Sequence, residues 1–305
     1  LHYPLRRQRQ MCIRDRYSHS NIHLILKAER LNPLVVVGKE SFKDSVWGRE
    51  IIESFNDNNM NFFLFDGIEP EPDICFVEKG LKLAKDNNCN AVLGIGGGSV
   101  LDVAKAIAGL FNEKFQDLSD YLNGREIKNK GLDFIAVPTT SGSGSEVSPA
   151  AVLKDKDSRI KTAIRDFRLT AKIALIDPVL TQTLPAKQTL YSALDALTHA
   201  LEAYLSKESS CYSDMLSRES FGLITDALPA CLEDLHNLQY RQLLSYGSLF
   251  AGLSFSSAGL GLCHALSHPI GMVYDIPHGL VNAVIIPYVV EFNYPENRIK
   301  YDNLL

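Results

Sequence analysis

Short apolar segments alternate with longer amphipathic segments through the first 180 or so residues of the chain. The apolar segments are rich in β-branched or aromatic residues, and each one closes on Gly or Pro. This pattern is typical of strands that are buried on both faces of a sheet. We expect strands at 33–38, 62–67, 91–96, 133–138 and 173–178, with amphipathic helices between them, such as 73–85.

The order of these elements predicts two structural units. Strand, helix and strand in succession form a mainly parallel sheet with helices on its faces. After Pro185 the strand-like segments cease, and helical periodicity continues to the end of the chain. We therefore predict an α/β domain over residues 18–183 and an all-helical domain over residues 184–305.

Both ends of the chain differ from this pattern. Residues 1–17 contain five arginines and show no apolar periodicity. We interpret them as non-native, disordered sequence outside the fold; a basic targeting peptide is the alternative. At the other end, "RIKYDNLL" stops inside what reads as a continuing helix. We expect an incomplete helical domain, with apolar helix faces left uncovered.

Composition excludes several classes of protein. The formal net charge is −5, without the excess of clustered Lys and Arg that nucleic-acid binding requires. The six cysteines include no C-x-x-C pair and show no regular spacing, which favours reduced thiols in the cytoplasm. No apolar run reaches the length of a membrane span, so a membrane is not an expected partner. The charge balance likewise means that we expect no nucleic-acid partner.

The stretch "AVLGIGGGSV" carries the first candidate chemistry. Gly96, Gly97 and Gly98 lie between a predicted strand and a predicted helix that Ser99 can cap, with Asp102 three residues further on. Glycines let the backbone approach a ligand closely, and the N–H groups of a helix start favour an anion such as a pyrophosphate. A plain tight turn is the alternative for this segment alone.

A second loop of the same kind follows the next strand. The stretch "PTTSGSGSEVS" (138–148) is small and rich in hydroxyl groups, with hydrogen-bond donors at Thr139, Thr140, Ser141 and Ser143. Two such loops at adjacent strand ends describe a dinucleotide cleft. The α/β domain is therefore predicted to bind a dinucleotide.

The helical half holds a candidate metal site. Asp195 and His199 are four residues apart and share a helix face, as do His264 and His268, and His278 follows ten residues later. A surface Asp–His pair is the alternative for the first two. One carboxylate with two or three imidazoles suits Fe²⁺ or Zn²⁺ with a position open for substrate. We predict a metal-binding catalytic domain here.

With both halves considered, the sequence resembles the iron-containing (group III) alcohol dehydrogenase family, within the dehydroquinate-synthase-like superfamily. The resemblance covers residues 21–305 and rests on four motifs in the family's order. They are "GGGSVLDVAKAIA" (96–108), "PTTSGSGSEVS" (138–148), "DALTHALEAYLS" (195–206) and "HALSHPIGMVYDIPHGLVNAVIIPYVVEFN" (264–293).

The resemblance implies a role for particular residues. It assigns the metal ligands to Asp195, His199, His264 and His278, and it places His268 near the nicotinamide without binding the metal. The cofactor residues that it implies are Gly96, Gly97, Gly98, Ser99, Asp102, Thr139, Thr140, Ser143 and Lys161.

The choice between NAD and NADP rests on the end of the first strand. Many NAD-using relatives carry an Asp there that bonds the ribose hydroxyls, whereas this chain has Gly38 and Lys39. A cation without the acid favours a 2′-phosphate and hence NADP, although Glu40 can replace the missing acid.

The resemblance implies hydride transfer between a small alcohol or aldehyde and NAD(P), with the metal lowering the pKa of the alcohol. His268 is expected to relay the alcohol proton or orient the nicotinamide, with an imidazole that titrates near the working pH. The alternatives are a zinc-dependent polyol dehydrogenase, a sugar-phosphate lyase or cyclase of the same superfamily, and a non-catalytic nucleotide-binding module. An edge strand near the N-terminus also allows a homodimer.

Overall fold

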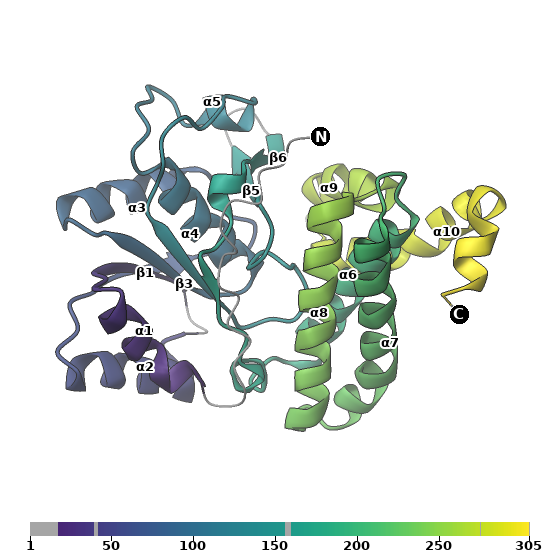
Figure 1. The fold of residues 1–305 in the computed structure, drawn as a ribbon, viewed down its shortest axis with the longest axis horizontal. Helices are drawn as coiled ribbons and strands as arrows, with labels where there is room; N and C mark the ends of the chain where they lie inside the picture. Colours follow the sequence, from purple (N-terminus) through teal and green to yellow (C-terminus); the bar gives the residue numbers. More distant parts are fainter. Residues whose placement is uncertain (1–17, 40–41, 156–159, 275, 305) are drawn as a thin grey trace.

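The computed structural model describes residues 18–39, 42–155, 160–274 and 276–304. The interpretation of residues 1–17 and the alternative at Glu40 concern positions outside these ranges. Figure 1 shows an α/β part, in purple to teal, beside a group of helices in green and yellow.

The α/β part is built on a five-stranded parallel sheet in the order β2–β1–β3–β4–β7. The predicted fold class, a parallel-sheet α/β unit followed by helices, is confirmed. Three strands match the predicted bounds, β2 is shifted by one residue, and β7 is much shorter than predicted. The strands are β1 (Pro33–Gly38), β2 (Phe63–Ile68), β3 (Ala91–Gly96), β4 (Asp133–Pro138) and β7 (Ile173–Ala174).

Helices cover both faces of this sheet. Leu34 and Val36 of β1 belong to one apolar core with helices α3 (Cys75–Asp86) and α4 (Gly98–Leu110). Val35 and Val37, which point the other way, belong to a second core with α1 (Ile22–Ala28) and α2 (Val46–Asp57). Because both sets of side chains are buried, the strand is a continuous apolar run.

The strand order places the glycine-rich turn at a reversal of the sheet. The chain moves from β1 to β2 on one side, and then returns to β3 on the other side of β1. Ligands of open α/β sheets bind outside the carboxyl ends of the strands at such a point. Gly96 at the end of β3 pairs with Pro138 at the end of β4, so the two candidate loops start side by side.

An antiparallel hairpin, β5 (Ala150–Asp155) and β6 (Ile160–Arg165), was not predicted from the sequence. The residues of β5 alternate between buried and half-buried, and neither strand forms the mainly apolar run that identified the parallel strands. Short elements complete this half: η1 (Ser18–Asn21), α5 (Ser119–Leu122), η2 (Phe167–Leu169) and η3 (Pro178–Thr181).

A buried lysine holds the hairpin and the loop before it. Lys105 of α4 is fully buried, and its ammonium group donates to the carbonyl oxygens of Ser145 (2.6 Å), Ser148 (2.9 Å) and Ala150 (2.8 Å). One turn earlier, Asp102 accepts from the hydroxyl of Ser145 at 2.6 Å. These bonds join α4 to the chain that leaves the second candidate loop.

The helical half packs around small side chains. Ala193, Ala196 and Ala200 line a core with Ile224 and Leu244, which lets the helices approach closely. Ser210 and Asn237 cap two of the helices. The helices are α6 (Ala186–Leu205), α7 (Cys211–Glu233), α8 (Leu238–Ala258), α9 (Leu262–Tyr274) and α10 (His278–Asp302).

Helix α10 carries exposed apolar side chains along one face. Val284, Tyr288 and Phe292, each one turn apart, are 59 %, 72 % and 73 % exposed. Within the described ranges, no single helix is long and apolar enough to cross a membrane. Only α8 and α9 taken together reach that threshold, by length and composition alone, and they meet at an angle of 106°.

The first described residues are held by a buried histidine. His19 is 1 % exposed; its Nδ1 lies 2.7 Å from Oδ2 of Asp177 and its Nε2 lies 3.1 Å from Oε2 of Glu50. Burial alone would lower the pKa of His19, but the two carboxylates outweigh burial and raise it above 6.5. Burial opposes the charge of Asp177, yet its bonds to His19 lower its pKa below 3.8.

Lys105→Met should destabilise the protein by about 3–5 kcal/mol, because three carbonyls lose a charged donor in a buried site. Denaturant unfolding measures this difference, and Lys82→Met, at an exposed position of α3, is the control. A Lys105→Met protein that unfolds at the same denaturant concentration as the wild type would show that the buried bonds contribute no net stability.

His19→Gln should destabilise the protein in a pH-dependent manner. The raised pKa of His19 contributes stability below 6.5 that is lost as the pH rises through the folded-state pKa, and the lowered pKa of Asp177 contributes stability above 3.8. The difference between wild type and variant, measured as unfolding free energy against pH, should be largest between those two values. A difference that is flat with pH would contradict a charged His19.

Candidate metal and nucleotide site

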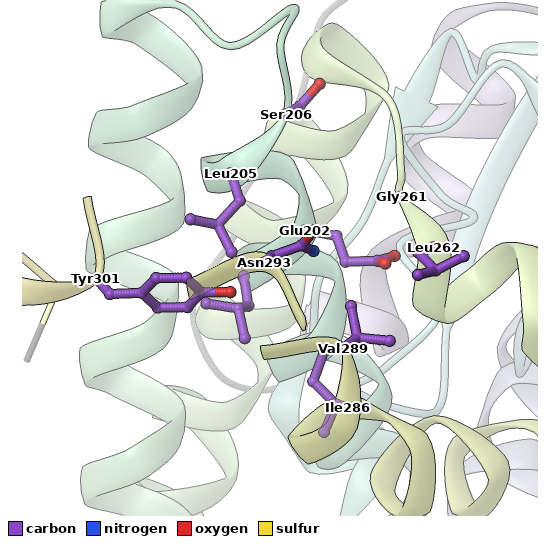
Figure 2. Close-up of a pocket in the computed structure, with 10 residues that line it drawn as sticks. Glu202, Leu205, Ser206, Gly261, Leu262, Ile286, Val289, Asn293 and Tyr301 are labelled. Carbon is purple, nitrogen blue, oxygen red and sulfur yellow. The ribbon is translucent and has the colours of Figure 1, made fainter. Parts of the chain in front are cut away.

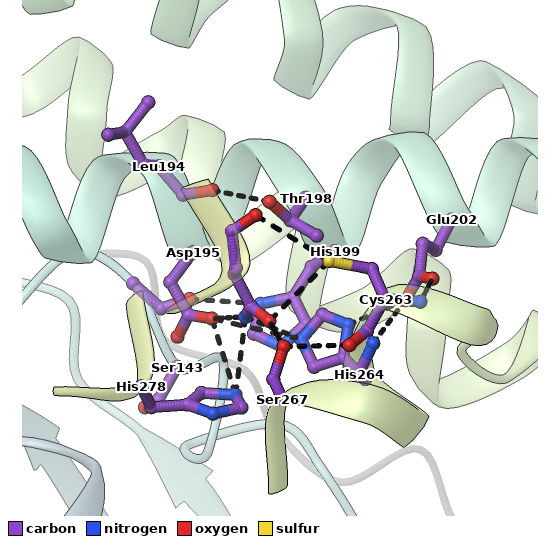
Figure 3. A network of polar contacts seen from close by, with 12 residues as sticks. Ser143, Leu194, Asp195, Thr198, His199, Glu202, Cys263, His264, Ser267 and His278 are labelled. Atoms are coloured by element: carbon purple, nitrogen blue, oxygen red, sulfur yellow. Dashed lines mark hydrogen bonds and ion pairs between the residues drawn. The ribbon is translucent and has the colours of Figure 1, made fainter. Parts of the chain in front are cut away.

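The four predicted metal ligands converge between α6, α9 and the start of α10. Figure 3 shows Asp195, His199, His264 and His278 directed toward one another. Oδ1 of Asp195 lies 3.7 Å from Nε2 of His264 and 3.7 Å from Nε2 of His278. One ligand atom each from Asp195, His199 and His264 lies within 4.8 Å of the other two. Tetrahedral ligands about 2.0–2.2 Å from a shared ion are roughly 3.4 Å apart, so this spacing suits one cation.

Helical spacing produces this convergence. Asp195 and His199 are one turn apart on α6, and both are at least nine-tenths buried. His264 lies in the first turn of α9, and its ring stacks on that of His199 with centroids 4.4 Å apart. His278 is the first residue of α10. Three separate helices therefore supply the four side chains.

Two of the imidazoles have a fixed tautomer. Nδ1 of His264 lies 2.6 Å from Oε2 of Glu202, and Nδ1 of His199 lies 3.3 Å from the carbonyl oxygen of Gly142. Carboxylate and carbonyl oxygens can only accept, so Nδ1 carries the proton in both rings. Nε2 is the nitrogen that remains for a metal, an arrangement common in metal-binding histidines.

Burial and neighbouring charges shift the pKa values of the side chains in the cluster. Burial would raise the pKa of Asp195, but the surrounding imidazoles reverse this effect and hold it below its usual range. Burial lowers the pKa of His199 to about 3. Burial opposes the charge of His264 as well, but the carboxylates of Asp195 and Glu202 raise its pKa. Asp195 and Glu202 are two buried carboxylates beside the single imidazole of His264, so a positive charge there is favourable.

His268 lies beside this cluster. Its ring centroid is 5.1 Å from that of His278. Burial is the main cause that lowers its pKa to about 4, with further contributions from His278 and Lys161. At such a pKa the imidazole is neutral at neutral pH, which differs from the expectation that His268 titrates near the working pH.

The glycine turn is arranged differently from the prediction. Gly97 is the N-cap of α4 and the helix begins at Gly98, so Ser99 is already inside the first turn. Its hydroxyl accepts from the backbone N–H of Glu71 at 3.2 Å instead of capping the helix. The predicted cap at Ser99 is wrong because the helix starts one residue before it.

The second loop packs directly on these glycines. A Cβ on Gly98 would lie 2.8 Å from Cβ of Ser143, and one on Gly97 would lie 3.1 Å from Cγ2 of Thr140. The glycines thus permit a close approach of the two loops, in addition to the access for a ligand that the sequence suggested. Thr139 donates its N–H to the carbonyl oxygen of Gly96 at 3.0 Å.

The remaining predicted cofactor residues lie near the turn but contact protein groups. Asp102 accepts from Ser145 and from the N–H of Val152, and Lys161 on β6 donates to Oε1 of Glu71 at 2.7 Å. Gly38 ends β1. The side chain of Lys39 is 63 % exposed, with its ammonium group 3.7 Å from Glu69.

Sequence reasoning missed two buried residues that contact the metal cluster. Glu202 follows His199 by three residues on α6, and Asn282 follows His278 by four residues on α10. Both positions share a helix face with a predicted ligand, which is the signal that could have identified them.

A small cavity of about 60 Å³ lies on the far side of Glu202. Figure 2 shows Glu202, Leu205 and Tyr301 around it. Its lining is mainly apolar, and among the described residues the buried hydroxyl of Tyr301 has no hydrogen-bond partner. The volume is sufficient for water but not for a nicotinamide and an alcohol.

The fold and the cluster together define a class of protein: a two-part enzyme with a nucleotide-type sheet and a buried carboxylate–imidazole site between helices. The profile described as "Iron-containing alcohol dehydrogenase" matches residues 10–178. The profile described as "Fe-containing alcohol dehydrogenase family, C-terminal" matches residues 189–305. The chain belongs to the iron-containing alcohol dehydrogenase family.

Individual relatives agree with this assignment. The chain is 32 % identical over 288 residues to the NADPH-dependent butanol dehydrogenase of Clostridium saccharobutylicum, covering 93 % of this chain and 74 % of that protein. It is 33 % identical over 244 residues to the NAD-dependent methanol dehydrogenase of Bacillus methanolicus, covering 80 % of this chain and 64 % of that protein. The chain thus spans about three quarters of the first relative and less than two thirds of the second.

A solved structure of a 1,3-propanediol oxidoreductase has the same fold, with a TM-score of 0.90 and 30 % identity. The similarity covers 98 % of this chain and 79 % of that one. The prediction of the family, an oxidoreductase family that uses iron and NAD or NADP, is confirmed. Because one relative is named for NADPH and the other for NAD, the comparison leaves the choice of nucleotide open.

Glu202→Gln should weaken metal binding about 10–100-fold, because the amide cannot replace the carboxylate that orients His264 and balances its charge. Chelator competition with Zn²⁺ measures the affinity. Glu208→Gln, at an exposed position beyond α6, is the matched control and should bind Zn²⁺ like the wild type. Equal affinity in both variants would contradict the orienting role of Glu202.

Proposed function

We propose that the chain transfers a hydride between a small alcohol or aldehyde and NAD(P) at a divalent metal held by Asp195, His199, His264 and His278. The observation that carries this proposal is the position of one carboxylate oxygen 3.7 Å from two imidazole nitrogens, inside a buried site. The relatives named as butanol and methanol dehydrogenases support the substrate class.

The donor set fits the proposed ion. Three imidazole nitrogens and one carboxylate oxygen suit a borderline divalent cation, Fe²⁺ or Zn²⁺. The two acids that face His264 need a compensating positive charge, which such a cation provides. The position of each Nδ1 proton leaves Nε2 of His199 and His264 for the ion.

The nucleotide is proposed to bind at the carboxyl ends of β3 and β4. Gly96, Gly97, Gly98 and Ser99 open the buried helix α4, whose N-terminal N–H groups and dipole favour a pyrophosphate. The loop that starts at Thr139 runs from this turn to the metal cluster, where Gly142 contacts His199. A nucleotide on the turn and a substrate on the metal would therefore be neighbours.

Five further residues near this turn are proposed to belong to the nucleotide site: Asp102, Thr139, Thr140, Ser143 and Lys161. Asp102 acts by holding the second loop through Ser145. The exposed ammonium group of Lys39, next to Gly38, favours NADP because it can reach toward a 2′-phosphate.

In the proposed reaction, the alcohol carbon gives a hydride to the nicotinamide and the alcohol oxygen loses its proton. The metal, when bound, supplies the Lewis acidity that lowers the pKa of the alcohol. His268 is proposed to orient the nicotinamide or to pass the proton to solvent. Its neutral imidazole has a lone pair that can accept that proton.

A homodimer in the cytoplasm is the proposed setting. Among the described strands, β2 lies at one edge of the sheet, and an edge presents backbone groups that a second copy can pair with. The five cysteines among the described residues are free thiols, as expected in a reducing compartment.

His264→Ala should abolish both metal retention and turnover while nucleotide binding survives, because the glycine turn lies in the other half of the chain. The measurements are metal content, nicotinamide absorbance with short primary alcohols and aldehydes under NAD and NADP, and nucleotide affinity. His236→Ala, at an exposed position between α7 and α8, is the control.

Metal content and turnover that persist in His264→Ala would refute the ligand assignment. Bound metal without hydride transfer in the wild type, together with turnover of a sugar phosphate, would favour the lyase or cyclase. Turnover restricted to polyols with Zn²⁺ would favour the polyol dehydrogenase.

A further inference from the structure

Asn282 is a fully buried polar residue at the centre of the proposed metal cluster. Its Nδ2 lies 2.7 Å from Oδ1 of Asp195, 3.2 Å from Nε2 of His264 and 3.3 Å from Nε2 of His278. These are the three atoms that the proposed metal would share. The residue itself is not among the predicted ligands.

The orientation of the Asn282 amide is fixed by its surroundings. Asp195 is a carboxylate and can only accept a hydrogen bond, so the nitrogen of the amide must face it. On the other side, the hydroxyl of Ser267 contacts Oδ1 of Asn282, and Sγ of Cys263 lies 3.7 Å from the same oxygen. Ser267 and Cys263 are both fully buried on α9.

We propose that Asn282 is a positioning residue that holds Asp195 in the orientation required to bind the metal. This inference rests on the proposed metal site. The N–H of Asn282 bonds the same oxygen, Oδ1, that faces His264 and His278. A carboxylate oxygen has lone pairs for both a hydrogen bond and an ion, so accepting from Asn282 does not use up the capacity of Oδ1 to bind a cation.

The bond to Asp195 is the strongest of the three contacts. The amide has two hydrogens for three neighbouring atoms, and the charged carboxylate oxygen is the closest by 0.5 Å or more. Hydrogen bonds to an ionised acceptor are shorter and stronger than neutral ones. The imidazole nitrogens are therefore less firmly held by the amide and remain available to a cation.

The contacts also join three helices, α6, α9 and α10, so a purely structural role is the competing explanation. A structural role would affect folding stability, whereas a positioning role would affect the affinity and the coordination geometry of the metal. Ser217 and Ser254 provide a comparison, because they form a fully buried 2.8 Å contact between α7 and α8.

The test compares Asn282→Leu, which has a similar volume and no donor, with Ser217→Ala as the control. Zn²⁺ affinity by chelator competition and the visible absorption spectrum of the Co²⁺-loaded protein are the readouts, and nucleotide binding reports on folding. Asn282→Leu should bind Zn²⁺ about 10–100-fold more weakly and shift the Co²⁺ spectrum. Ser217→Ala should change neither, even if it lowers stability.

Unchanged or tighter Zn²⁺ binding by Asn282→Leu would overturn the proposal, since tighter binding would mean that the amide competes with the metal. If that variant does not fold, Ser267→Ala replaces it: loss of the contact to Oδ1 should weaken Zn²⁺ binding by a smaller factor, and unchanged affinity would overturn the proposal. If the wild-type protein binds no Zn²⁺, the proposed metal site is contradicted as well. Normal binding in the wild type and in Asn282→Leu would remove only the role of Asn282.

Discussion

The hydrogen bonds of the Lys105 ammonium group fix the position of the loop that connects the α/β half with the helical half. This group is buried in α4 and bonds three carbonyl oxygens of the chain that leaves the second loop. An ammonium group is stable in such a place only when its donors are satisfied. The loop is therefore held at one end by the sheet, where Thr139 bonds Gly96, and at the other by α4.

Between these fixed ends, the loop reaches the helical half. The hydroxyl of Ser141 lies 3.0 Å from that of Ser245 on α8, and the carbonyl of Gly142 contacts His199 on α6. A Cβ on Gly142 would lie 2.7 Å from the carbonyl oxygen of Ser192, and the φ of Gly144 is +60°. The small residues of this loop thus allow it to pack closely between α4 and the helices of the other half, in addition to leaving room for a ligand.

Local patterns predicted the parts of this structure that depend on local physics. Strands β1, β3 and β4 were predicted at their observed bounds, because a parallel strand buried on both faces is a nearly continuous apolar run. The positions of Asp195, His199 and His264 on helix faces followed from a spacing of four residues. The ligand roles remain a proposal, but the side chains do lie together.

The features that the sequence did not reveal depend on contacts between distant residues. The hairpin β5–β6 has no continuous apolar run, and the partners of His19 are 31 and 158 residues away. The cap predicted at Ser99 is absent because α4 begins at Gly98, with Gly97 as its N-cap. At these two positions a Cβ would lie close to Thr140 and Ser143, which are more than 40 residues away in the sequence. Asn282 looked like an ordinary helix residue until its neighbours were known.

The contact between Gly142 and His199 also has a thermodynamic consequence. The loop that begins at the glycine turn, where we propose that the nucleotide binds, contacts His199, a proposed metal ligand. A nucleotide that orders this loop would therefore also restrict the imidazole of His199. Binding free energies that are linked in this way are reciprocal: whatever factor the nucleotide adds to metal affinity, the metal adds to nucleotide affinity. A single backbone carbonyl thereby connects the proposed nucleotide turn with the proposed metal site.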